Sequence, residues 1–179
     1  QATMPASLCE DLHTEVRPEA RDSRRLYAQH LSADARGEAW LRFEHALRPL
    51  HEAGRLGCVV IQTPAWMKPG DTGRALVEEA RGRLPDYRLV VEFGNPKWLG
   101  GDQCEDTLEM LEEVGVGVAC VDFTEYPVVT AATTDLAMVR FHGRHADPEL
   151  EPGMRAGWRS AHRYTTEELE EWVPRIREL

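Results

Sequence analysis

Four short apolar runs, separated by stretches with helical periodicity, constrain the fold of this chain more than any other feature. The runs lie at residues 56–61, 88–92, 116–122 and 136–142, and they are rich in valine. Their length and β-branching favour strands that are buried on both faces. No hairpin signal separates one run from the next. Because strands that alternate with helices are joined by right-handed crossovers, the pattern predicts a parallel α/β sheet.

The stretches around these runs predict amphipathic helices. One is expected from Gly37 to about Gly54, where the apolar residues recur at helical spacing, and others at about residues 71–84 and 102–114. A final helix is expected after the capping-box residue Thr165. The side chains predicted to face inward from this final helix are Leu169, Trp172, Val173 and Ile176, with Pro174 bending it.

The order of elements fits either a closed barrel or an open doubly wound sheet. No glycine-rich phosphate motif follows any of the strands, since residues 70–73 (GDTG) resemble neither a P-loop nor a dinucleotide-binding turn. This favours the barrel. We therefore predict a parallel (β/α) TIM-barrel-like fold, present as a partial barrel of about four strands in a single domain over residues 1–179, with residues 1–36 poorly defined by pattern.

Charge and composition exclude several classes of protein. The net charge is −10, from 31 acidic and 21 basic residues, so non-specific binding of nucleic acid is not expected. No apolar run reaches the about 18 residues that a membrane-spanning helix needs, and no secretory pattern is present. Cys9, Cys58, Cys104 and Cys120 form no C-x-x-C pair, so we expect reduced thiols in a cytoplasmic protein.

Polar side chains end all four predicted strands. They are Gln62, Glu92, Asp122, and Arg140 together with His142. Side chains alternate between faces along a strand, so each polar residue is expected to share a face with the residue two positions before it. Those residues are Val60, Val90, Cys120 and Met138. Because ligands bind at the carboxyl ends of parallel strands, the polar side chains are expected to converge on one site.

These side-chain types predict acid/base catalysis. Glu92 and His142 are assigned as the acid/base pair, because a buried carboxylate and an imidazole can both be tuned towards neutral pH. Asp122 is expected to orient His142 or to bind a metal, and Arg140 to hold an anionic group with two hydrogen bonds. We expect a hydrolase or isomerase that acts on a small phosphate- or carboxylate-bearing substrate.

Two other functions remain open at this point. Further substrate contacts are assigned to Gln62, Asn95 and Arg144, while no cofactor and no definite metal site is assigned. The first alternative is a metal-dependent phosphodiesterase of nucleic acid, with ligands from Glu92, Asp122 and His142. The second is a non-catalytic module that binds an anion. Bound metal would favour the first, and an anion on Arg140 with no base within reach would favour the second.

The strand-end strings resemble one known family. LGCVVIQTP at 56–64, VEFGNPKW at 91–98 and VRFHGR at 139–144, followed by Tyr164, resemble the YecE-like family, a domain of unknown function. The resemblance runs from about Gly37 to the C-terminus and implies a TIM-type barrel. Gly94 stands where the family normally has arginine, and Thr63 where it usually has phenylalanine.

The resemblance covers only the middle strands of the family's barrel. The first three strands and the last strand of the family have no counterpart in this chain. A four-stranded slice has two unpaired edges and an uncovered apolar face, and both favour association. We therefore expect this chain to pair with a second copy or to depend on residues outside this sequence.

Overall fold

The computed structural model describes residues 30–124, 126–144 and 162–179, so Cys9 and most of the segment 1–36 lie outside the described residues. The chain divides into two compact units. Within the described residues, the first unit contains residues 30–58 and Arg83–Tyr87, and the second contains Val59–Gly82 and the chain from Arg88 onwards. Each unit is described by itself below.

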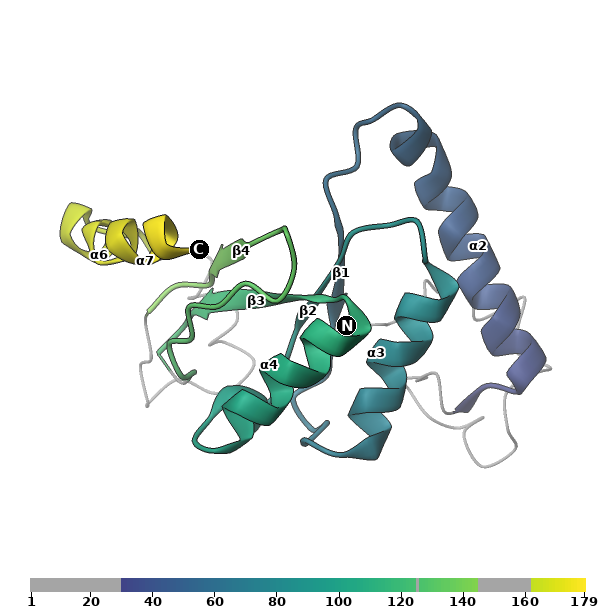
Figure 1. Ribbon diagram of the computed structural model, residues 1–179. Helices are drawn as coiled ribbons and strands as arrows, with labels where there is room; N and C mark the ends of the chain where they lie inside the picture. Colours follow the sequence, from purple (N-terminus) through teal and green to yellow (C-terminus); the bar gives the residue numbers. More distant parts are fainter. Residues whose placement is uncertain (1–29, 125, 145–161) are drawn as a thin grey trace. The chain divides into compact units, whose positions relative to one another are not determined.

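The second unit is built on a parallel sheet, as the sequence predicts. Its strands are β1 (Val59–Gln62), β2 (Leu89–Glu92), β3 (Gly117–Asp122) and β4 (Met138–Phe141). They pair in the order β1-β2-β3-β4, and all three pairings are parallel (Figure 1). Every residue of β2 and β3 is buried, as is typical of strands in the middle of a parallel sheet.

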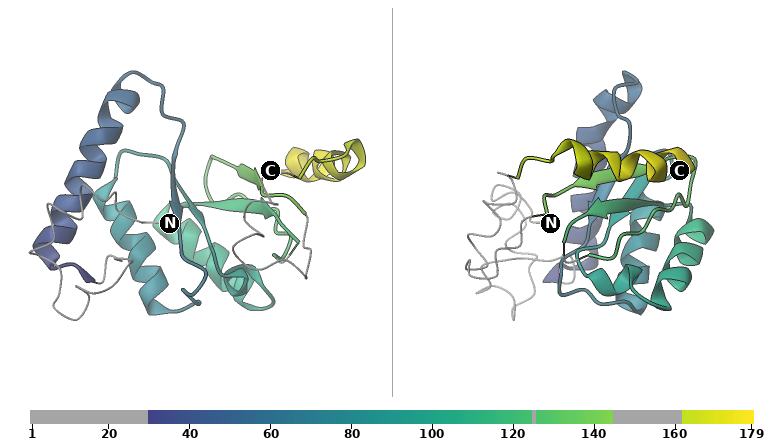
Figure 2. Two further views of the ribbon diagram at one scale, coloured as in Figure 1. Left: turned by 180° about the vertical axis from the view of Figure 1, so that it is seen from behind. Right: turned by 90° about the vertical axis from the view of Figure 1, so that its left-hand side faces the viewer.

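Two α-helices cover one face of this sheet. Helix α3 (Asp71–Arg83, of which residues up to Gly82 belong to this unit) follows β1, and α4 (Gln103–Val114) follows β2 (Figures 1 and 2). The helices are neighbours, since Arg74 on α3 pairs with Glu113 on α4 at 3.0 Å. Gly115 ends α4 with a left-handed backbone, φ 70°, where glycine is favoured.

The short helix η4 (Pro96–Leu99) anchors the loop after β2. Its Trp98 donates a hydrogen bond from Nε1 to the carbonyl oxygen of Met67, 2.9 Å away, and stacks on Phe93 with ring centroids 4.5 Å apart. A Cβ atom at Gly73 of α3 would lie 2.3 Å from the Trp98 ring. The ring therefore packs directly on the α3 backbone, and Trp98 is a packing residue.

The C-terminal segment forms two short helices, α6 (Thr166–Glu170) and α7 (Trp172–Glu178). Thr165 and Glu168 form the predicted capping box. The interruption falls at Glu171, as expected for a helix that contains Pro174, which has no N–H to donate to the preceding turn.

The predicted burial of this segment is wrong for three of its four apolar residues. Trp172 is buried, but Leu169, Val173 and Ile176 are 45%, 44% and 49% exposed. The periodicity correctly indicates an amphipathic surface. Within the described part of the chain, however, only the Trp172 side packs, against Phe141 of β4 with ring centroids 5.5 Å apart.

The first unit contains α2 (Ala33–Glu52), which begins four residues before Gly37. Its N-cap is Ser32, whose side chain accepts a hydrogen bond from the Ala35 N–H at 3.1 Å. Two apolar residues of the helical repeat in α2, Phe43 and Leu50, are exposed. None of the helices in the described residues is long and apolar enough to cross a membrane. Cys58, Cys104 and Cys120 are free thiols.

Candidate functional site

A pocket of about 620 Å³ lies at the carboxyl ends of the strands. Its walls include the last residues of β1, β2 and β4, and the segments that follow β3 and β4. Its lining residues are Gln62, Glu92, Gly94, Val121, Phe123, Tyr126, Phe141, His142, Gly143, His162 and Tyr164. The pocket therefore occupies the position in which ligands bind to parallel α/β folds.

Glu92 is the centre of the polar part of this pocket. It is only 4% exposed, and its Oε1 accepts a hydrogen bond from Gln62 Nε2 at 2.7 Å. Its Oε2 accepts from the guanidinium of Arg140, with which it forms an ion pair. His142 Nε2 lies 3.2 Å from Glu92 Oε1. Three residues that the sequence predicts for the site therefore meet around the buried carboxylate of a fourth, Glu92.

His142 Nε2 is buried and has no hydrogen-bond partner among the described residues. Its 3.2 Å separation from Glu92 Oε1 brings the two groups together, but they are not aligned as a hydrogen bond. Leaving a buried polar atom without a partner costs free energy, and such atoms are rare in folded proteins. His142 Nε2 is therefore an uncommon polar atom, buried next to the pocket and without a hydrogen-bond partner in the described chain.

Asp122 does not join this cluster, which corrects the face assignment made from the sequence. In the pairing of β2 with β3, Val90 lies opposite Gly117 and Val91 opposite Val118. The odd-numbered residues of β3 therefore share a face with Glu92, and Cys120 and Asp122 lie on the other face. The physical reason is the register between the strands, since a shift of one residue exchanges the two faces.

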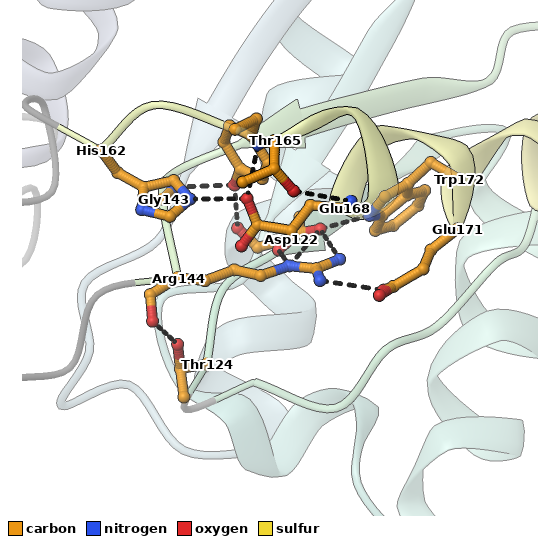
Figure 3. A network of polar contacts seen from close by, with 10 residues as sticks. Asp122, Thr124, Gly143, Arg144, His162, Thr165, Glu168, Glu171 and Trp172 are labelled. Carbon is orange, nitrogen blue, oxygen red and sulfur yellow. Dashed lines mark hydrogen bonds and ion pairs between the residues drawn. The ribbon is translucent and has the colours of Figure 1, made fainter.

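On its own face, Asp122 binds Arg144 and the indole of Trp172 (Figure 3). Arg144 Nε lies 2.9 and 3.1 Å from the two Asp122 oxygens, and its Nη2 lies 2.7 Å from Oδ2. A second carboxylate, Glu171, lies 2.8 Å from Arg144 Nη1. Arg144 therefore holds two acidic groups and is not a free substrate contact in this structure.

The Asp122 network shifts the pKa values of its members. Burial of Asp122 acts to raise the pKa of its carboxyl, but the hydrogen bonds from Arg144 and Trp172 outweigh burial and leave this pKa below its usual value. The hydrogen bond to Asp122 raises the pKa of Arg144. Burial raises the pKa of Tyr164. At neutral pH, Asp122 is therefore an ionised structural group.

Backbone and tyrosine contacts connect this network to the pocket wall. Tyr164 accepts a hydrogen bond from the Gly143 N–H at 2.9 Å, and its hydroxyl lies 3.5 Å from the Asp122 carbonyl oxygen. Gly143 has φ 88°, a left-handed backbone that favours glycine. The backbone N–H of His142 also donates to the Asp122 carbonyl oxygen at 3.1 Å. The segment that follows β4 and the residue Tyr164 are thus both linked to the backbone of Asp122, next to the wall of the pocket.

Aromatic side chains that the sequence did not single out as site residues form much of the pocket wall. Phe123 and Tyr126 follow β3, with ring centroids 5.4 Å apart. Tyr164 contacts Phe141 edge-on at 5.1 Å and His162 at 4.7 Å. His162 Nε2 in turn lies 3.3 Å from Glu168 of the capping box. Phe141 ends β4, whereas Phe123, Tyr126, His162 and Tyr164 lie outside helices and strands, so neither strand alternation nor helical period indicates where those four side chains lie.

Asn95, predicted as a substrate contact, forms hydrogen bonds within the loop that follows β2 and with residue 65. Its Nδ2 donates to the Ala65 carbonyl oxygen at 2.7 Å, and its Oδ1 accepts from the Lys97 N–H at 3.1 Å as the N-cap of η4. Asn95 is absent from the described lining of the pocket. The structure therefore gives this residue a local role at the rim.

The two positions at which the chain departs from the YecE-like pattern contact each other. The Gly94 N–H donates to Thr63 Oγ1 at 3.0 Å, and a Cβ at residue 94 would lie 2.2 Å from the Thr63 carbonyl oxygen. The Gly94 carbonyl oxygen accepts a hydrogen bond from Tyr126. Any side chain at position 94 would require the segment around Thr63 to move, so the two departures form one local arrangement.

The metal-ligand set proposed from the sequence is not assembled on one face. Glu92 and His142 lie in the pocket, whereas Asp122 lies on the opposite face of β3. Within residues 30–124, 126–144 and 162–179, no group of three or more His, Cys, Asp or Glu side chains is arranged to hold a metal ion. Glu92, Asp122 and His142 therefore do not form a common ligand set.

A parallel sheet with a polar pocket at the carboxyl ends of its strands defines an α/β protein of the TIM-barrel-like class. The chain belongs to the DUF72 family, described as a protein of unknown function, whose family model matches residues 20–179. This confirms the resemblance to the YecE-like family.

Similar proteins are covered by this chain only in part. The UPF0759 protein YunF of Bacillus subtilis is 27% identical over 155 residues, which is 82% of this chain and 55% of that protein. A DUF72 structure from Thermotoga maritima is 29% identical, with a TM-score of 0.68 over 79% of this chain and 53% of that chain. A DUF72 structure from Enterococcus faecalis is 18% identical, with a TM-score of 0.75 over 99% of this chain and 70% of that chain. The chain thus spans about half the length of YunF and of the Thermotoga protein.

Proposed function

We propose that the pocket is the active site of an acid/base enzyme of the hydrolase or isomerase class. One observation carries the proposal. His142 Nε2 is a buried ring nitrogen without a hydrogen-bond partner among the described residues, and it lies in the pocket 3.2 Å from the buried carboxylate of Glu92. An imidazole beside a carboxylate is a common arrangement for moving a proton to or from a substrate.

The contacts of Glu92 support separate roles for the two groups. Its carboxylate is already engaged by Gln62 and by Arg140, so it is held in place. In the proposed reaction, His142 exchanges the proton with the substrate, and Glu92 orients His142. Gln62 and Arg140 position Glu92.

The alternatives raised by the sequence receive less support from these contacts. A non-catalytic anion-binding module needs Arg140 to be available, but Arg140 is paired with Glu92 and a base lies within reach. The metal-dependent phosphodiesterase needs Asp122 beside Glu92, but the register of β3 directs Asp122 to the other face. The anionic substrate expected from the sequence relied on the same Arg140. We therefore base the proposal on His142 and Glu92 alone.

The test is a screen for turnover with matched variants. Wild type, His142→Gln and Glu92→Gln are incubated with panels of esters, glycosides, phosphomonoesters, aldoses and ketoses, and conversion is followed by NMR. Loss of a general acid/base group typically costs about 10²–10⁴-fold in rate, so both variants should lose at least 100-fold. Arg74→Gln, which changes an exposed ion pair between α3 and α4, is the control and should retain the rate. Equal turnover by wild type and His142→Gln, or no turnover by wild type, counts against the proposal.

A further inference from the structure

The chemistry of the pocket lining selects among substrate classes, provided that this pocket is the proposed active site. Among its described lining residues there is no lysine or arginine. The charged lining residue, Glu92, is negative and already balanced by Arg140. An anionic group placed against Glu92 would meet a like charge without a new cation to offset it. A cation would have to compete with Arg140 for the Glu92 carboxylate.

The polar atoms that remain suit hydroxyl groups. The Glu92 carboxylate has acceptor capacity beyond its contacts with Gln62 and Arg140, since two carboxylate oxygens offer about four acceptor positions. His142 Nε2, without a hydrogen-bond partner in the described chain, lies 3.2 Å from Glu92 Oε1. A hydroxyl both donates and accepts, so adjacent hydroxyls on one ring could serve the carboxylate and the imidazole at this spacing.

The remaining walls are aromatic and apolar. Phe123 and Tyr126 form a tilted pair there, and Tyr164 also lines the pocket. The ring of Phe141, which lies opposite Asp122 in the register of β3 and β4, packs on Tyr164 and Trp172 on the other face of the sheet. The hydroxyls of both tyrosines are used by the protein, since Tyr126 donates to the Gly94 carbonyl oxygen and Tyr164 accepts from the Gly143 N–H. Their rings therefore offer apolar surface, which fits the C–H face of a ring whose polar groups point to Glu92 and His142.

We propose that the pocket binds a neutral polyhydroxylated ring of monosaccharide size, with adjacent hydroxyls on Glu92 and His142. The cavity of about 620 Å³ lies within the range typical of small-molecule sites. Gln62 and Arg140 hold the Glu92 carboxylate, and the pair of Phe123 and Tyr126 contacts the less polar side of the ring. The proposed acid/base chemistry then takes place on a hydroxyl-bearing substrate.

Binding is measured separately from turnover by saturation-transfer NMR at pH 7.5. The probes are D-glucose, D-xylose and D-fructose, together with D-glucose 6-phosphate and inorganic phosphate. At least one neutral sugar should bind, and D-glucose 6-phosphate should bind no more than threefold more tightly than D-glucose. His142→Ala should weaken sugar binding about tenfold, the effect of losing one well-formed hydrogen bond. His142→Gln places an amide donor near the same position and should largely restore binding.

His45→Gln, on the exposed side of α2, is the control and should bind as wild type does. Circular dichroism on every variant separates lost binding from lost folding. Three results would each overturn the inference: tighter binding of the phosphorylated sugar by more than threefold, no binding of any neutral sugar, or unchanged sugar binding by a folded His142→Ala chain. If the enzyme converts a phosphorylated substrate and this turnover depends on His142, the inference of a neutral sugar ligand is wrong. The proposed acid/base function is then still supported.

Discussion

Glu92 and Asp122 end neighbouring strands of one parallel sheet, yet their side chains lie on opposite faces of it. Glu92 contacts Gln62, Arg140 and His142 in the pocket. Asp122 forms an ion pair with Arg144 on the opposite face of the sheet. The two buried carboxylates therefore have different tasks. Substitution of Glu92 should affect the proposed chemistry, and substitution of Asp122 should affect the stability of the C-terminal segment.

Asp122→Asn should lower the free energy of unfolding by about 1–3 kcal/mol. The change removes the charge that Arg144 and Trp172 bind and leaves their donors with a weaker acceptor. Urea unfolding followed by circular dichroism measures the difference. Asp135→Asn is the matched control, because Asp135 is exposed and pairs with exposed Arg88, so its change should stay within about 0.5 kcal/mol. Equal losses in the two variants would contradict the assigned role of Asp122.

The stability of the wild-type chain should fall in acid in a way that depends on Asp122. Its folded-state pKa is lowered, so its contribution is fully present above the unfolded value of about 3.9 and is lost as the pH falls through the folded value. Unfolding midpoints in urea between pH 5 and pH 2.5 measure this. Asp122→Asn should show a shallower fall below about pH 4, whereas a parallel fall would show that other carboxyls dominate.

Gly94→Ala should destabilise the chain, because the new Cβ would lie 2.2 Å from the Thr63 carbonyl oxygen and 2.9 Å from the Ala65 nitrogen. Both contacts are with backbone, which cannot rotate away, so a loss of about 1–3 kcal/mol or more is expected. Gly82→Ala is the matched control in α3. Its Cβ would meet nothing within 4 Å, and helix propensity predicts no loss and a gain of at most about 1 kcal/mol. Thermal unfolding of both variants measures the contrast, and a fully stable Gly94→Ala chain would refute the close approach.

The purified chain should associate with itself. Leu169 of α6 and Val173 and Ile176 of α7 are exposed, and in the described sheet β1 and β4 each pair with a single strand. Light scattering on wild type should therefore give a mass above that of one chain, and Val173→Glu should shift it towards one chain. A wild-type monomer with a single cooperative unfolding transition would show that the chain needs no partner.

Local patterns predicted the fold well and the burial of its helices poorly. The runs at Val59–Gln62 and Leu89–Glu92 are short, β-branched and flanked by helical periods, so their state and parallel pairing follow from the sequence. The exposure of Val173 and Ile176 does not follow. Periodicity shows that a helix has an apolar side, but tertiary packing decides how much of that side finds a partner.

The same distinction explains the site. Gln62, Glu92, Arg140 and His142 were predicted together because alternation along each strand places them correctly. Asp122 was misassigned because its face depends on the register between β2 and β3, which no single strand encodes. The aromatic wall is contributed by loops and by the segment before α6, where neither alternation nor helical period applies.

A pair of double-mutant cycles tests the central claim most directly. The free energy of unfolding is measured for Glu92→Gln, His142→Ala and their combination, and in parallel for Asp122→Asn, His142→Ala and theirs. Because His142 Nε2 lies 3.2 Å from Glu92 Oε1, the first cycle should give a coupling of about 0.5–3 kcal/mol. Because the Asp122 side chain lies on the opposite face, the second cycle should stay within about 0.5 kcal/mol of additivity. Coupling of His142 to Asp122 as strong as its coupling to Glu92 would contradict the arrangement of the site.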